Sequence, residues 1–251
     1  MNSKTRFTSR VETYTKYRPS YPAEAIDYLY GVVGLNETSE VLDVGAGTGI
    51  FSRLLLERGS RVTAVEPNDA MREAALSASR NHPRFQAVAG SAEETGVQDA
   101  SYDYIVSAQA FHWFDRAAAK REFRRVLKPG GKTILVWNTR LKEGTPFLEG
   151  YEKLLRGLGT DYEQVNHQNI SREMLNDFFR KDGLSEARFD NRQVLDFDGI
   201  AGRLRSSSYT PQPGHPGYEP MMRELRELFE RTSENGTVNF DYVTEVYWGE
   251  V

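Results

Sequence analysis

The sequence contains no cysteine among its 251 residues. Disulfide bonds, cysteine nucleophiles and thiolate-bound zinc are therefore excluded for this chain. Long apolar runs are also missing, because no stretch approaches the roughly 18 apolar residues that a membrane-spanning helix needs. The stretch from Met1 to Arg10 is polar and lacks the apolar centre of a secretory signal. These absences predict a cytoplasmic protein without a membrane partner.

An excess of basic charge is missing as well. The chain has 32 Lys and Arg against 36 Asp and Glu, which gives a formal net charge of −4. Proteins that bind nucleic acids gather Lys and Arg on one face, so this balance argues against a nucleic-acid partner. The group Arg121, Arg124 and Arg125 has helical spacing and is typical of a solvated helix face. A small molecule is the expected partner, and the oligomeric state stays open.

Short apolar segments alternate with amphipathic segments between residues 22 and 137. The apolar segments predict five strands, at residues 41–44, 61–65, 85–89, 102–107 and 133–137. The amphipathic segments predict helices, at residues 22–30, 49–58, 70–79 and 115–127. This alternation predicts an α/β fold with a Rossmann-like, doubly wound, mostly parallel sheet and helices on both faces.

The pattern changes after Asn138. Residues 148–158 and 171–179 read as helices of a small helical cap, and residues 218–232 read as a strong helix. Weak alternation over residues 187–197 indicates a sixth strand. Alternation over residues 237–248 indicates an antiparallel edge strand, which completes a seven-stranded sheet.

These elements divide the chain into four expected parts. They are an N-terminal arm or lid at residues 1–20, a cofactor-binding Rossmann-like core at 21–140, a helical cap insertion at 141–185, and a C-terminal completion of the sheet at 186–251.

A glycine-rich loop follows the first predicted strand, in the sequence Val41-Leu42-Asp43-Val44-Gly45-Ala46-Gly47-Thr48-Gly49. Glycine adopts positive φ easily and lets a ligand approach the backbone. The free N–H groups of the helix that follows favour negative charge. Glu66 ends the second predicted strand, where a carboxylate can accept hydrogen bonds from both hydroxyls of a ribose. The loop and Glu66 together predict a nucleoside-containing cofactor.

The spacing of the glycines separates two kinds of cofactor. The fingerprint of nicotinamide and flavin dinucleotides is G-x-G-x-x-G, which would place a third glycine where this chain has Ile50. The chain has G-x-G-x-G instead, a tighter loop that suits the smaller methionine group of S-adenosylmethionine. A nicotinamide-dependent oxidoreductase remains an alternative.

Four further segments follow the loop in order. They are Val65-Glu66-Pro67-Asn68, Gly90-Ser91-Ala92-Glu93, Ser107-Ala108-Gln109-Ala110-Phe111-His112-Trp113-Phe114 and Leu127-Lys128-Pro129-Gly130-Gly131. With the loop, their sequence and spacing resemble class I S-adenosylmethionine-dependent methyltransferases over residues 36–140. Tyr17-Arg18-Pro19 and the C-terminal tail more weakly resemble the branch of trans-aconitate methyltransferases.

This resemblance implies S-adenosyl-L-methionine as the cofactor and gives roles to the matching positions. The implied cofactor-binding residues are Gly45, Ala46 and Gly47 at the methionine group, Glu66 at the ribose, Pro67 and Asn68 beside the adenine, Ser91, Ala92 and Glu93 at its edge, and Gln109, Ala110 and Phe111 near the methyl group. Many members have Asp-Ala where this chain has Ser91-Ala92, so the contact to the adenine amino group would be a neutral one.

The N-terminal arm carries aromatic residues and an arginine that could cover the cofactor. Aromatic faces attract a sulfonium cation, and an arginine can pair with a carboxylate of the cofactor or of the substrate. We assign Tyr17 and Arg18 to the cofactor. We assign Tyr14, Trp113 and Arg140 to the substrate, and an ordinary packing or surface role is the alternative. Arg203 and Arg205 are further candidates for binding an acidic substrate.

Methyl transfer from a sulfonium requires alignment and exclusion of water rather than a metal, so we expect no metal site. His112 is the candidate for proton removal, since its side chain titrates near neutrality. A packing or orienting role is the alternative, because a carboxylate acceptor needs no base. Nucleic-acid amino methyltransferases carry Asn/Asp-Pro-Pro-aromatic where this chain has Gln109-Ala110-Phe111-His112.

We therefore predict a methyltransferase that acts on a small molecule, at the oxygen of a carboxylate or hydroxyl. A module that binds S-adenosylmethionine without catalysis is the second alternative.

Overall fold

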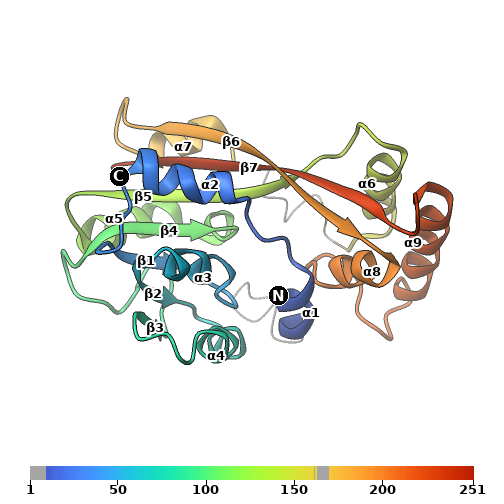
Figure 1. Cartoon of the computed structure of the whole chain (residues 1–251), viewed down its shortest axis with the longest axis horizontal. Coiled ribbons are helices and arrows are strands. Elements are labelled where there is room, and N and C mark those ends of the chain that lie inside the picture. Colours follow the sequence, from blue (N-terminus) through green and yellow to red (C-terminus); the bar gives the residue numbers. More distant parts are fainter. Residues whose placement is uncertain (1–9, 161, 163–169) are drawn as a thin grey trace.

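The computed structural model describes residues 10–160, 162 and 170–251. Its strands form one seven-stranded sheet in the order β3-β2-β1-β4-β5-β7-β6 (Figure 1). The strands are β1 (Glu40–Val44), β2 (Arg61–Val65), β3 (Phe85–Val88), β4 (Tyr102–Ala108), β5 (Leu127–Arg140), β6 (Ser185–Leu195) and β7 (Val238–Gly249). Strands β1 to β5 pair in parallel, whereas β7 runs antiparallel to both β5 and β6. The Rossmann-like, mostly parallel fold is thereby confirmed.

The helices connect the strands and cover the sheet. They are α1 (Val11–Tyr17), α2 (Ala23–Tyr28), α3 (Ile50–Glu57), α4 (Asp69–Ala78), α5 (Arg116–Val126), α6 (Pro146–Leu158), α7 (Arg172–Phe178), α8 (Phe197–Arg205) and α9 (Tyr218–Thr232), with a π-helical turn η3 (Leu29–Val33) and a 3-10 turn η4 (Phe111–Trp113). No helix among these described elements is both long and apolar enough to cross a membrane.

The two faces of the sheet have separate apolar cores because side chains alternate along each strand. Val41 of β1 packs with Ile26 of α2 and Leu55 of α3 on one face. The next residue, Leu42, packs with Phe123 of α5 and Phe178 of α7 on the other. Helices therefore cover both faces, as the sequence predicts.

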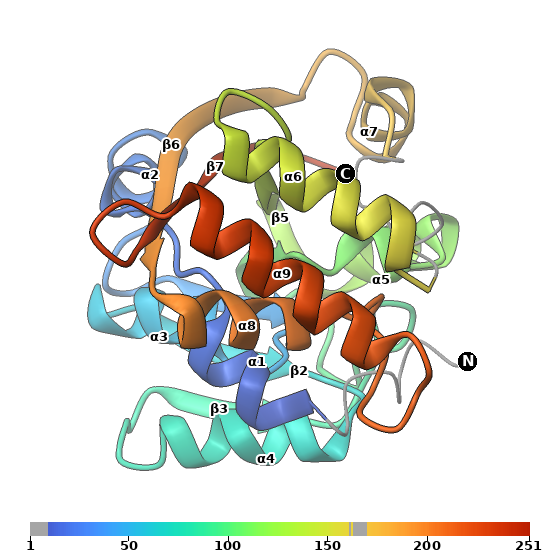
Figure 2. The same ribbon diagram turned by 90° about the vertical axis from the view of Figure 1, so that its right-hand side faces the viewer.

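A helical layer lies beyond one end of the sheet, where α6, α8 and α9 pack together (Figures 1 and 2). Its core includes Tyr151, Leu225 and Phe240. Phe240 belongs to the first half of β7, whereas Val246 in the second half of this strand packs in the core of the sheet. The long strand β7 thus joins the helical layer rigidly to the sheet.

Three local features differ from the sequence prediction. The antiparallel strand β7 lies one position in from the edge, and β6 is the outermost strand. Residues 197–205 form α8, and the arm contains α1, although the sequence pattern indicated neither helix. Strand β5 begins at Leu127, with a shift in its pairing to β4 between residues 127 and 132. Tertiary packing stabilises these short helices, because a helix of seven or nine residues is unstable alone.

The expected division into arm, core, cap and C-terminal part stays a prediction. Residues 1–9 of the arm, and residues 161 and 163–169 of the cap, lie outside the described residues. Within the described cap, α6 packs with α9 in the helical layer, whereas α7 packs against α5 on the sheet.

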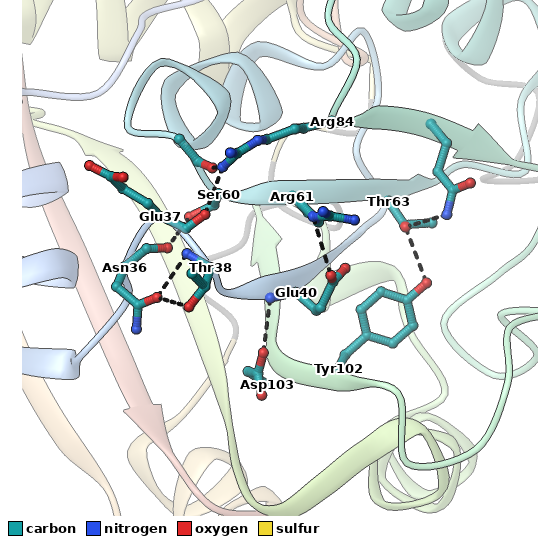
Figure 3. Close-up of polar contacts among 12 residues, drawn as sticks. Asn36, Glu37, Thr38, Glu40, Ser60, Arg61, Thr63, Arg84, Tyr102 and Asp103 are labelled. Carbon is teal, nitrogen blue, oxygen red and sulfur yellow. Dashed lines mark hydrogen bonds and ion pairs between the residues drawn. The ribbon is translucent and has the colours of Figure 1, made fainter.

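The amino ends of the parallel strands are tied together by polar contacts (Figure 3). The backbone N–H of Glu40 donates to Asp103 Oδ2 at 2.9 Å, and Glu40 forms an ion pair with Arg61 at 3.6 Å. The hydroxyl of Tyr102 donates to Thr63 Oγ1 at 3.1 Å. These bonds satisfy polar groups within the sheet, and the groups that face a pocket lie at the opposite, carboxyl ends.

Candidate active site

Two adjoining compartments lie at the carboxyl ends of β1, β2 and β4. The first compartment lies over β2 and the start of α4, and Glu66, Asn68 and Ala92 contribute to its wall. The second compartment extends from the glycine loop towards α1 and α8, where Arg18 and Arg203 line it. Both compartments share the residues Tyr14, Gly45, Gly47, Ala108, Gln109 and Trp113. Ligands of open parallel sheets bind at this edge, so the position agrees with the sequence prediction.

Glu66 and the glycine loop are bonded directly to each other. Glu66 Oε2 accepts the backbone N–H of Gly47 at 2.9 Å, and Oε1 accepts that of Asn68 at 2.9 Å. Burial raises the pKa of the Glu66 carboxyl, while these two N–H donors oppose the rise. Each carboxylate oxygen has two lone pairs, so both can still accept a hydroxyl.

The loop after β1 has glycine at two positions where other groups of the protein come close to its backbone. Gly45 and Gly47 have φ of 73° and 57°, which favour glycine. A Cβ at Gly45 would lie 2.5 Å from the Cβ of Ala110, so any side chain there would push the β4 loop away.

The far wall of the first compartment begins at α4. Asn68 caps this helix by accepting the N–H of Met71 at 3.1 Å, and Met71 itself lines the compartment. Ser91, Ala92 and Glu93 form the opposite side, and Glu93 Oε1 accepts the N–H of Asp115 at 2.9 Å. Glu93 thus links this wall to the start of α5.

The loop after β4 forms the boundary between the compartments. Gln109 has a φ of 61°, an unfavourable value for a residue with a side chain, and its N–H donates to the carbonyl of Val136 at 2.9 Å. Trp113 lines both compartments, and His112 lines the second. The rings of His112 and Trp113 lie 4.8 Å apart.

Asp43 is a buried carboxylate at the end of β1 that faces the second compartment. Its Oδ2 accepts the hydroxyl of Ser52 at 2.6 Å, and its buried Oδ1 has no partner among the described residues. Burial raises the pKa of Asp43 from 3.8 to about 7. The free oxygen can therefore accept a hydrogen bond from a bound ammonium group.

Four basic side chains line the second compartment: Arg18, Arg140, Lys142 and Arg203. Arg140 pairs with Glu152 and donates to the hydroxyl of Tyr162 at 3.0 Å. Lys142 lies 4.0 Å from the same carboxylate. The second compartment is therefore positively charged.

The structure brings most of the predicted site residues together. Lining the compartments are Gly45, Ala46, Gly47, Glu66, Pro67, Asn68, Ser91, Ala92, Glu93, Gln109, Ala110, Arg18, Tyr14, His112, Trp113 and Arg140. Two predicted cofactor residues lie elsewhere. Phe111 is fully buried among Phe114, Trp137 and Phe178, and the ring of Tyr17 packs over Gly202.

The sequence prediction missed several lining residues. Met71, Tyr21, Tyr209 and Asp43 face the compartments, although the sequence pattern predicts none of them at the site. Asp43 lies inside the glycine motif, and Met71 lies three residues after the helix cap, so both carried a local signal. Tyr209 reaches the site through the packing of α8, which the sequence pattern did not indicate.

Comparisons with known proteins agree with this geometry. The profile of a family described as a methyltransferase domain matches residues 42–135. An uncharacterized methyltransferase of Mycobacterium tuberculosis is 46% identical over 134 residues, which are 53% of this chain and 52% of that protein. The malonyl-(acyl-carrier protein) O-methyltransferase of Serratia marcescens is 32% identical over 139 residues, which are 55% of this chain and 49% of that protein. The chain thus spans about half the length of the curated relatives it matches.

A solved structure extends the likeness in fold to the whole chain. The phosphoethanolamine N-methyltransferase 2 of Haemonchus contortus, in complex with S-adenosyl-L-methionine, has a TM-score of 0.59 at 15% identity. The match covers 99% of this chain and 58% of that one.

The fold and the paired compartments define a Rossmann-like protein with a ligand site at the carboxyl edge of its sheet. More narrowly, residues 42–135 match the family described as a methyltransferase domain, which confirms the resemblance to the class I methyltransferases.

Proposed function

We propose that the protein is an S-adenosyl-L-methionine-dependent methyltransferase that methylates an oxygen, in a carboxylate or hydroxyl, of a small molecule. The observation that carries this proposal is the meeting of two compartments at Gly45 and Gln109. One compartment suits a nucleoside, and the other is polar and positively charged. The relative from Serratia marcescens, named as an O-methyltransferase, supports an oxygen acceptor.

The residues present fit the cofactor. Glu66 ends β2 with both oxygens able to accept ribose hydroxyls. Pro67, Met71 and Phe114 offer apolar surface to an adenine ring. The unpartnered Oδ1 of Asp43 suits an ammonium group, which the methionine portion carries.

When bound, S-adenosyl-L-methionine would supply a methyl group on a sulfonium ion; an acceptor oxygen would bond to the methyl carbon in line as the carbon–sulfur bond breaks and S-adenosylhomocysteine leaves. Tyr14 and Trp113 line the boundary of the compartments, where their ring faces attract a cation. Helix α1 packs between α4 and α8 (Figure 2), and its Tyr14 lines both compartments, so this helix would help to exclude water from the reacting groups. His112 lines the second compartment and would remove a proton from a hydroxyl acceptor.

Arg18 is the candidate partner for the carboxylate of the methionine group. It lies 4.7 Å from the ring centre of Tyr14 and lines the second compartment near the glycine loop. A guanidinium can hold a carboxylate through two parallel hydrogen bonds.

A thermal-shift experiment separates this function from an oxidoreductase. We expect saturating S-adenosylhomocysteine to raise the melting temperature by roughly 5–10 °C, because a ligand that binds only the folded state stabilises it. NAD⁺ and NADP⁺ at equal concentration should leave it unchanged. A shift with NAD⁺ and none with S-adenosylhomocysteine would overturn the proposal.

Turnover then separates an enzyme from a module that only binds the cofactor. The protein is incubated with S-adenosyl-L-methionine and a panel of small carboxylic acids and alcohols, and S-adenosylhomocysteine formation is measured. Formation that depends on an added acid or alcohol supports an O-methyltransferase. Binding of the cofactor without acceptor-dependent turnover across the panel would favour the non-catalytic alternative.

A further inference from the structure

Arg203 is a buried cation for which the described residues supply no carboxylate. It lies on α8 and is 6% exposed. It forms no ion pair with any of the described residues. Its Nε donates to the hydroxyl of Tyr242 at 3.0 Å, and its Nη1 donates to the hydroxyl of Ser207 at 2.9 Å. A guanidinium has five N–H donors, so these two bonds leave donors that face the second compartment.

This arrangement is costly unless a ligand completes it. Burying a charge without a counter-ion carries a large desolvation penalty. The rings of Phe240 and Tyr242, with centres 5.7 and 6.0 Å from the guanidinium carbon of Arg203, offset part of this penalty. They carry no negative charge, so the demand for an anion remains.

A second arginine adds to the positive charge. Arg18 donates from Nη2 to the carbonyl of Ser206 at 3.0 Å, and its buried Nε has no partner among the described residues. Burial, and then the positive charge of Arg203, lower the pKa of Arg18. The two guanidinium groups therefore repel each other, which an anion between or beside them would relieve.

Among the residues that the structure describes, the other charges around the second compartment do not compensate Arg203. Arg140 is the contrasting case, because it pairs with Glu152. Among the described residues that line this compartment, Asp43 is the only carboxylate. Asp43 lies at the end of β1 with Ser52, and burial raises its pKa to about 7, so its negative charge is incomplete at neutral pH.

We propose that Arg203 binds a carboxylate or phosphate group of the methyl acceptor, and that this group does not itself receive the methyl. The inference rests on the proposed function. A guanidinium withdraws charge from the oxygen that it binds and so makes it a weaker nucleophile. Methylation of that oxygen would also remove the charge of a carboxylate, or one of the two charges of a phosphate monoester, and so weaken the compensation of the buried Arg203 in the product complex. Both reasons assign Arg203 to a non-reacting group of the acceptor.

The test measures anion binding with the cofactor position filled. Protein saturated with S-adenosylhomocysteine, whose carboxylate can engage Arg18, is titrated by calorimetry with glutarate, with its uncharged counterpart glutaramide, and with inorganic phosphate. The variants are Arg203→Gln and Arg203→Lys, with Arg205→Gln as the matched control. Arg205 lies on the same helix, donates to the carbonyl of Ala201, and does not line the second compartment.

We expect glutarate or phosphate to bind the wild-type protein and the Arg205→Gln variant with the same affinity. Glutaramide should bind to neither protein. Arg203→Gln should weaken anion binding at least about tenfold, and Arg203→Lys should be intermediate because a lysine keeps the charge without the planar fork. Preference for glutarate identifies a carboxylate, and preference for phosphate identifies a phosphate ester.

Either of two results would overturn the inference: anion binding that is the same in wild type and Arg203→Gln, or no binding of either anion by the wild-type protein. S-adenosylhomocysteine affinity, measured first in each variant, keeps this outcome separate from the proposed function. If S-adenosylhomocysteine does not bind the wild-type protein, the proposed function fails. If it binds and the anions do not depend on Arg203, the inference about Arg203 fails alone.

Discussion

The carboxylate of Glu66 accepts the backbone N–H of Gly47 at 2.9 Å, which joins the end of β2 to the glycine loop after β1. The bond crosses between two neighbouring parallel strands at the edge where the ligand is expected. It places the residue assigned to the ribose and the loop assigned to the methionine group in one rigid unit. The side chain of Glu66 thus positions the glycine loop and is also the one assigned to bind the ribose.

Replacement of Glu66 should therefore weaken binding twice over. Glu66→Ala removes the expected ribose contacts and frees the N–H of Gly47. Hydrogen bonds to a charged group contribute about 1.5–3 kcal/mol each, so we expect roughly ten- to hundredfold weaker affinity for S-adenosylhomocysteine by calorimetry. Glu57→Ala, at an exposed position on α3, is the control. Equal affinities of Glu66→Ala and wild type would contradict the ribose assignment.

Arg18→Gln should discriminate between two ligands that differ in the methionine portion. If Arg18 holds the carboxylate, affinity for S-adenosylhomocysteine falls by roughly tenfold or more, whereas affinity for 5′-methylthioadenosine, which lacks the carboxylate, stays the same. Arg58→Gln, which removes a surface ion pair with Asp27, is the control. Equal losses for both ligands would show that Arg18 acts on the fold rather than on the carboxylate.

The buried carboxyl of Asp43 should make the unliganded protein less stable as the pH rises. Its pKa is about 7 in the folded protein against 3.8, so between pH 4 and 7 the folded state binds more protons than the unfolded state. The free energy of unfolding should fall across this window, by up to about 4 kcal/mol, and level off above it. Glu66, whose pKa burial also raises, adds to the same trend.

Asp43→Asn tests this assignment by urea unfolding at pH 5 and pH 8. Asparagine keeps an oxygen for the hydroxyl of Ser52, so we expect higher stability than wild type at pH 8 and little difference at pH 5. Asp27→Asn at the surface is the control. Parallel pH profiles for Asp43→Asn and wild type would exclude Asp43 as the source.

Gly202 allows α1 to lie against α8, because a Cβ at this position would overlap the ring of Tyr17. Gly202→Ala should displace α1, expose the peptide bond after Lys16 to trypsin, and weaken S-adenosylhomocysteine binding. Gly157→Ala on α6 is the control, because its new methyl group would meet nothing within 4 Å. This variant should keep its affinity for S-adenosylhomocysteine and gain about 0.5–1 kcal/mol in free energy of unfolding. Unchanged proteolysis and affinity in Gly202→Ala would contradict a covering role for α1.

His112→Gln distinguishes the two kinds of oxygen acceptor. A hydroxyl must lose its proton, so we expect turnover to fall roughly a hundredfold. A carboxylate acceptor is already ionised, and turnover should then change by less than about tenfold. Initial rates between pH 5.5 and 9 with saturating cofactor provide the measurement. Turnover equal to wild type with a hydroxyl acceptor would remove His112 as the base.

The glycine loop, Glu66 and the five strands of the parallel part of the sheet could be predicted from the sequence because their signals are local. A short apolar run followed by glycines is typical of a buried parallel strand that leads into a ligand-binding turn. The acid after the second strand lies at the carboxyl edge that all parallel strands share. Phe111 shows the limit of this reasoning. It stands beside Ala110 in the motif, yet η4 directs its ring into the core of the sheet.

The tertiary structure alone decided which residues line the second compartment. Arg18 and Arg203 are 185 positions apart, and no local pattern links them. They meet because β7 carries the helical layer beyond the sheet and because the missing side chain of Gly202 lets α1 pack on α8. The sequence by itself thus determined the sheet and the nucleoside edge, through short-range periodicity. The charge of Arg203, for which the described residues supply no carboxylate, depends on burial and long-range packing, which a residue list does not contain.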